Sequence, residues 1–169
     1  MPSLTPPARV KPTDAEICAA WQKAEEQGVG EELRPNFERA GQHLATLNGM
    51  TRDFRDPAVW TALSVIGRGI VDIIAFILID GDLVKHDYAE GAVEAELSTI
   101  YARLGAPVVQ PDPTRLKGKH NYVARVIVSI VTIGIYLFWW YANLFRDGNT
   151  HFRHNWVWED SLAQAVQGL

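Results

Sequence analysis

An arginine and an aspartate stand inside an otherwise apolar block, residues 59–80. Arg68 and Asp72 are four residues apart, so on a helix they share a face and can form an ion pair. Ionisable groups within membrane segments often line ion or proton paths, which makes the pair a functional-site hypothesis. The alternative, which we favour, is an internal ion pair that fixes helix register, because no second carboxylate lies deep in the other apolar block.

Three histidines near the apolar blocks, His86, His151 and His154, are weak candidates for metal ligands. Zinc requires three or four ligands in tetrahedral geometry, and the sequence pattern does not convincingly supply the remaining ligands. We therefore expect no metal and no other cofactor, with the histidines acting as interfacial polar residues. The acidic cluster after the first block is expected to form a solvated face (Asp80, Asp82, Asp87 and Glu90).

Composition places the chain in a broad class and excludes others. A net charge of −4 argues against a nucleic-acid-binding protein, because such domains carry a basic excess. The single cysteine, Cys18, permits no internal disulfide. No hydrolase elbow, phosphate-binding glycine loop or dinucleotide fingerprint occurs, and we expect no enzyme. We also expect no cleaved secretory signal, since the N-terminal residues lack an apolar core.

The apolar run from Val126 to Phe145 contains no charged residue. A helix of about 20 residues can cross a hydrocarbon core of roughly 30 Å. Trp139, Trp140 and Tyr141 lie near its C-terminal end, where an aromatic belt at the headgroup level is expected. The run therefore predicts a membrane helix.

The earlier block, residues 59–80, is more ambiguous. Its apolar side chains favour insertion by roughly 0.3–0.6 kcal/mol each, whereas Arg68 and Asp72 each oppose it by roughly 2.5–3.5 kcal/mol near the centre of a span. The sum is near zero. We expect a second membrane helix sheltered by the first, and keep a re-entrant or surface-lying segment as alternatives.

The two blocks partly align when the sequence is shifted along itself so that Ser64 falls on Ser129. Roughly three identities are expected by chance, and eight occur without a gap: Ser64/Ser129, Gly69/Gly134, Ile70/Ile135, Asp82/Asp147, His86/His151, Glu94/Glu159, Leu97/Leu162 and Leu104/Leu169. Duplication and chance similarity both remain open. Each unit would hold an apolar helix, a short polar link and an amphipathic interfacial helix, with Gly69 and Gly134 as equivalent points of helix contact or kinking.

These elements define an all-α membrane protein with two tandem units after an N-terminal helical hairpin. The expected organisation is a disordered leader over 1–12, the hairpin over 13–51, a first membrane unit over 52–104, a linker over 105–116 and a second membrane unit over 117–169.

The segment Ser129, Thr132, Gly134-Ile135-Tyr136 and Trp140-Tyr141 resembles the S-x-x-T-x-G-I-Y-x-x-x-W-Y pattern of a family of small bacterial integral membrane proteins, known as a domain of unknown function. The resemblance covers about residues 122–155 and implies a membrane protein without implying an activity. The first unit departs from this pattern: residues 67–71 lack the Thr and Tyr and add a charge. Equal roles for the two units are therefore not expected.

The function that these observations favour is a small non-catalytic integral membrane protein, acting as a scaffold or accessory subunit of a membrane assembly. Its expected partners are the lipid bilayer and either a second copy or a larger membrane protein, with no nucleic acid. We expect a multi-pass protein of the cell membrane with a cytoplasmic N-terminus, and leave the side of the C-terminus open. The alternative is an oligomeric channel or transporter-like protein with a polar path at Arg68 and Asp72.

Overall fold

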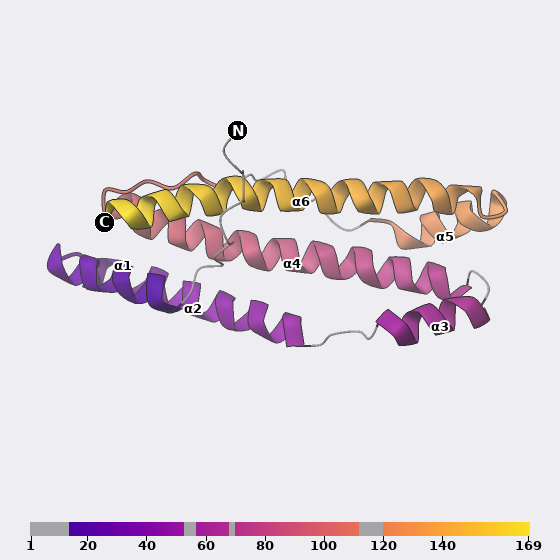
Figure 1. The fold of residues 1–169 in the computed structure, drawn as a ribbon, viewed down its shortest axis with the longest axis horizontal. Coiled ribbons are helices and arrows are strands. Elements are labelled where there is room, and N and C mark those ends of the chain that lie inside the picture. Colours follow the sequence, from indigo (N-terminus) through magenta and orange to yellow (C-terminus); the bar gives the residue numbers. More distant parts are fainter. Residues whose placement is uncertain (1–13, 53–56, 68–69, 112–119) are drawn as a thin grey trace, which may run out of the picture. The chain divides into compact units, whose positions relative to one another are not determined.

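A computed structural model describes residues 14–52, 57–67, 70–111 and 120–169, and over these residues the chain forms six helices and no strand. The all-α class is therefore confirmed. The helices are α1 (Asp14–Glu26), α2 (Gly30–Arg52), α3 (Pro57–Gly67), α4 (Ile70–Arg103), α5 (Tyr122–Val131) and α6 (Ile135–Gly168), all labelled in Figure 1.

The helices form two compact units that do not follow the order of the chain. Unit 1 takes its described residues from Met1–Leu44, Gly91–Asp112 and His154–Leu169, and unit 2 takes them from Ala45–Glu90 and Pro113–Arg153. Helices α2, α4 and α6 each contribute residues to both units. Each unit thus joins segments that are distant in the sequence.

Unit 1 has an apolar core between the α1–α2 pair and the second halves of α4 and α6. Gly28 follows the end of α1 with a left-handed φ of 72°, and Val29 N donates to Ala24 O at 2.9 Å, which is a typical glycine C-cap. The chain then returns as α2, so that Trp21 meets Phe37 edge-on at 5.1 Å between ring centroids. The buried apolar side chains of this unit are Ala20, Ala24, Leu33, Phe37, Ala40, Val93, Leu97, Ile100, Tyr101, Leu104, Val108, Trp158, Leu162 and Ala165.

In unit 2 the first halves of α4 and α6 run side by side in the same direction (Figure 1). Phe76 lies 5.8 Å from Trp140 between ring centroids, and further along the two helices Asp87 lies 2.6 Å from His151. Helix α5 folds back along α6, since Tyr122 stacks near Trp140 at 6.5 Å. Three helical segments therefore surround a small interior.

The expectation of a single membrane helix over the run 126–145 is wrong in this structure. Helix α5 ends at Val131 and α6 begins at Ile135, with a turn between them. Ile133 and Gly134 adopt φ values of 51° and 85°, which a continuous right-handed helix does not permit. Of the helices in the described parts of the chain, none combines the length and the apolar character that a membrane crossing requires.

The separate interfacial helices expected after each apolar block are also not seen. Helices α4 and α6 each continue for 34 residues, through the segments expected to be polar links. Neither helix contains a proline, and an internal glycine such as Gly81 or Gly148 costs only about 1 kcal/mol relative to alanine. Packing along the rest of each helix outweighs that cost.

Candidate functional site

The turn between α5 and α6 is built by the polar residues of the S-x-x-T-x-G pattern. The Ser129 hydroxyl donates to Arg125 O at 2.8 Å, and the Thr132 hydroxyl donates to Val128 O at 2.8 Å. The Thr132 oxygen also accepts from Tyr136 N at 3.1 Å. The last of these bonds gives an acceptor to Tyr136 N in the first turn of α6, where amides lack helical partners. Val128 O already accepts from Thr132 N at 2.9 Å.

Gly134 lies where the chain reverses direction. Its amide donates to Ser129 O at 2.8 Å, and its φ of 85° favours glycine because L side chains rarely adopt it. Space does not explain the glycine, since the nearest side-chain atom to an added Cβ is Leu137 Cδ1 at 4.0 Å. Gly69, the predicted equivalent, lies outside the described residues.

Unit 2 exposes apolar side chains along α3, α5 and the first halves of α4 and α6. Ile133 in the turn is 93% exposed, and Phe138 is 80% exposed. Among the described residues, all but three of the exposed large apolar side chains belong to this unit, the exceptions being Val109, Trp156 and Val157. Such a concentration is typical of surfaces that bind a protein partner or a membrane.

The interior of unit 2 is correspondingly polar. Val84 and Trp140 are its only buried apolar side chains among the described residues. The buried polar side chains of this unit are Asp80, Asp87, Ser129, Asn143 and His151. Among the described residues of unit 2, buried polar side chains therefore outnumber buried apolar ones, which is the reverse of the usual pattern in a water-soluble domain.

Asp80 joins α4 to α5 within this interior. Its side chain is buried, and Oδ2 lies 2.8 Å from His120 Nδ1 and 3.2 Å from Arg125 Nη1. The Arg125 guanidinium also lies 5.3 Å from the ring centroid of Trp140, in cation–π range. The buried carboxylate is thus paired with two basic groups, as burial of a charge requires.

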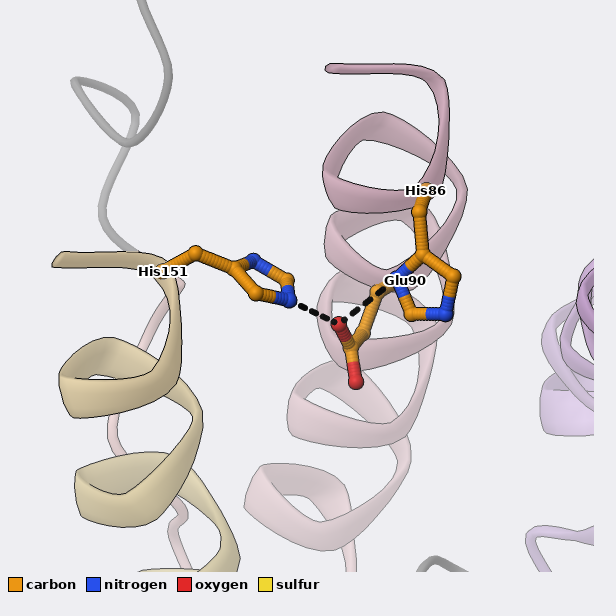
Figure 2. A group of neighbouring side chains, drawn as sticks. All are labelled: His86, Glu90 and His151. Atoms are coloured by element: carbon orange, nitrogen blue, oxygen red, sulfur yellow. Dashed lines mark ion pairs between the residues drawn. The ribbon is translucent and has the colours of Figure 1, made fainter. Parts of the chain in front are cut away.

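A second polar cluster joins α4 to α6, as Figure 2 shows. Glu90 Oε2 lies 3.4 Å from His86 Nδ1 and 3.3 Å from His151 Nε2. The other ring nitrogen of His151, Nδ1, lies 2.6 Å from Asp87 Oδ1. One potential ligand atom from each of His86, Glu90 and His151 lies within 4.8 Å of the other two.

Of the predicted Arg68–Asp72 ion pair, the structure describes only the aspartate. Arg68 lies outside the described residues, and Asp72 is half-buried in the first turn of α4. The predicted aromatic belt is divided: Trp139 and Tyr141 are exposed, whereas Trp140 is completely buried. Trp140 therefore belongs to the protein interior and does not face outward with its neighbours.

Of the three histidines named as weak metal candidates, the structure places His86 and His151 together and does not group His154 with them. Their companions Asp87 and Glu90 were expected on a solvated face, which is wrong because Asp87 is buried and Glu90 is half-buried. The i,i+4 spacing of His86 and Glu90 could have indicated that these two side chains share one face of a helix. The sequence alone did not say which face of α4 meets α6.

The surface of unit 1 carries its own ion pairs between helices. Arg39 on α2 bonds to both carboxylate oxygens of Glu96 on α4, at 2.5 and 3.1 Å. The Arg39 hydrogen bond, with help from Asn36, holds the pKa of Glu96 below its ordinary value of 4.5. Arg103 and Glu32 form a similar pair at 2.9 Å.

The chain was compared with protein-family models, with curated proteins and with solved structures, and none of the three comparisons finds a match.

Proposed function

We propose that this chain is a membrane-inserted, non-catalytic scaffold or accessory subunit. Unit 2 dips its apolar segments into one leaflet of a bilayer, and unit 1 presents a helical surface to a membrane partner or a second copy. The observation that carries the proposal is the inverted character of unit 2, with apolar side chains outside and paired charges inside.

A lipid environment explains why apolar side chains would lie outside and polar ones inside unit 2. Hydrocarbon covers exposed Ile, Val and Phe side chains without the cost that water imposes. Polar side chains must then pair inside the protein, because lipid offers them no hydrogen bonds. The Asp80–Arg125 pair at 3.2 Å supplies such internal pairing.

Helix length favours insertion into one leaflet. Helix α5 contains 10 residues, or about 15 Å at 1.5 Å per residue. This is half of a hydrocarbon core of roughly 30 Å. The turn at 132–134 then returns the chain along α6, so both ends of the hairpin stay on the same side.

A duplication accounts for the similar course of the two apolar segments. The shift that places Ser64 on Ser129 also places Ile70 on Ile135 and His86 on His151. The sequence identities at this shift support two copies of one unit.

Labelling in intact cells tests the topology. Cys18, which is exposed, is replaced by Ser, and single cysteines at Gln22, Thr114 and Gln167 are probed with a membrane-impermeant thiol reagent. Insertion into one leaflet predicts the same accessibility at all three positions, protected in intact cells and labelled after permeabilisation. Labelling of Thr114 alone in intact cells would establish two spans and contradict the proposal.

Depth measurement tests insertion directly. A fluorophore at Ile133, in the turn, is expected to be quenched by lipids brominated on their acyl chains in reconstituted vesicles. The matched control is a fluorophore at Thr99, on the exposed face of α4 in unit 1. Equal quenching at both positions, or none at Ile133, would remove the membrane proposal.

A further inference from the structure

The His86, Glu90 and His151 cluster holds an arrangement of atoms that a hydrogen-bond network alone does not explain well. Two imidazole nitrogens converge on the same carboxylate oxygen, Glu90 Oε2 (Figure 2). Their distances of 3.4 and 3.3 Å exceed the 2.7–3.2 Å typical of N–H···O hydrogen bonds. The two histidine nitrogens therefore lie near Glu90 Oε2 but slightly beyond the usual hydrogen-bond distance.

The buried carboxylate of Asp87 fixes the state of His151. A carboxylate accepts, so the contact of 2.6 Å requires His151 Nδ1 to carry the proton. In the neutral imidazole the other nitrogen, Nε2, then presents a lone pair. That lone pair faces an oxygen of Glu90 at 3.3 Å, so two acceptors oppose each other unless a proton or a cation lies between them.

We propose that His86, Glu90 and His151 bind a divalent first-row transition metal, with Zn²⁺ as the representative ion. Two ligands at 2.0–2.2 Å from a tetrahedral ion lie about 3.4 Å apart, close to the distances from Glu90 Oε2 to the two histidine nitrogens. Asp87 supplies the carboxylate that orients a ligating histidine in many metal sites. Two imidazoles and one carboxylate suit zinc better than the oxygen-binding ions Ca²⁺ and Mg²⁺.

The position of the cluster gives the ion a structural role. His86 and Glu90 are one helical turn apart on α4, and His151 lies on α6, so the metal links the two long helices of unit 2. The shift that relates the two apolar segments also places His86 on His151. The site thus lies where the proposed copies face each other. It depends on the geometry of unit 2 and not on membrane insertion.

The test uses the full-length chain without a histidine tag, purified, stripped with a chelator and titrated with Zn²⁺ alone. We expect about one ion per chain by isothermal titration and by elemental analysis. Replacing Zn²⁺ by Co²⁺ is expected to give the visible absorption of a four-coordinate site. Zinc should also raise the unfolding temperature of the stripped protein, since a ligand that binds only the folded state stabilises it.

Variants locate the site. His86→Gln and Glu90→Gln, at partly exposed ligands, are expected to weaken zinc binding at least about 100-fold, and Asp87→Asn about 10–100-fold. The control His43→Ala removes a half-buried histidine of α2 in unit 1 and should leave binding unchanged. Circular dichroism of the metal-free variants verifies that each keeps its helices.

Two outcomes overturn the proposal. Stripped wild-type protein that binds zinc no more tightly than His86→Gln would show that a proton on His151, and not a metal, separates the two acceptors. Tight binding that persists in both His86→Gln and Glu90→Gln would place the ion elsewhere. Failure of the membrane tests above leaves the zinc measurements unaffected, so the two proposals fail separately.

Discussion

Units 1 and 2 share the same long helices and bury opposite kinds of side chain. The second halves of α4 and α6 turn Leu97 and Leu162 inward, whereas the first halves turn Asp80, Asp87 and His151 inward. Unit 1 resembles a water-soluble helical bundle, in which apolar burial drives packing. Unit 2 joins its helices through buried ion pairs together with aromatic contacts around Trp140, and leaves many large apolar side chains on the surface.

Whether a segment forms a helix and which of its faces packs inward are therefore set by different interactions. Each of α4 and α6 is a single helix of 34 residues, so local propensity is satisfied equally in both halves. The surroundings decide which face turns inward. Four experiments test this contrast between the two units.

Asp80→Asn removes the charge that Arg125 and His120 share inside unit 2. We expect the free energy of unfolding to fall by about 3 kcal/mol, because the Arg125 guanidinium, which is only 13% exposed, is left without its carboxylate partner. The matched control is Asp82→Asn on the same helix, where the side chain is 50% exposed and the expected change is within about 0.5 kcal/mol. Denaturant unfolding followed by circular dichroism measures both, and equal effects would contradict a polar interior.

Leu97→Ala creates a cavity in unit 1, where the side chain is only 1% exposed. The expected loss of unfolding free energy is about 3 kcal/mol. The control Leu63→Ala acts on α3 in unit 2, where the side chain is 42% exposed, and should cost below about 1 kcal/mol in detergent. Hydrogen exchange should show faster opening of the second half of α4 in the first variant alone. A larger effect from Leu63 would reverse the assignment of the apolar core.

Gly134→Ala places a Cβ on a residue with φ of 85°, at an expected cost of about 1 kcal/mol. Gly148→Ala is the matched control, because Gly148 lies within α6 and an added Cβ meets nothing within 4 Å. It should stabilise the protein by about 0.5–1 kcal/mol. The two substitutions should thus shift the unfolding midpoint in opposite directions. A shift of the same sign would show that the α5–α6 turn does not need its glycine.

The smallest effect concerns pH and the surface of unit 1. The Arg39 guanidinium keeps the pKa of Glu96 below 4.5 in the folded protein. The pair therefore contributes its full stability above about pH 4.5, the ordinary pKa, and loses it as pH falls through the lowered folded value. Thermal unfolding between pH 6 and pH 3 should show a steeper decrease for wild type than for Glu96→Gln. Parallel curves would mean that the pair adds nothing to stability, as many surface pairs do.

Several features of the fold followed from local sequence. The amphipathic pattern expected after the first apolar block is seen in the second half of α4, where Val93, Leu97 and Tyr101 are buried, because a helix repeats its faces every 3.6 residues. The continuity of α4 was not predicted, and the turn at 132–134 was anticipated only as a point of helix contact or kinking at Gly134. Hydropathy averages a run of residues, and the left-handed conformation of Ile133 and Gly134 leaves little trace in that average.

Local sequence was sufficient to predict a helical chain, two apolar segments of similar pattern, and a point of helix contact or kinking at Gly134. The burial of Trp140 and Asp80 is known only from the packing of the helices. The same is true of the cluster formed by His86, Glu90 and His151. The physical reason is that a helix offers every side chain a defined direction along its own axis. Which face of α4 is buried depends on the helix that packs against it. That helix is α6, which is distant from α4 in the sequence.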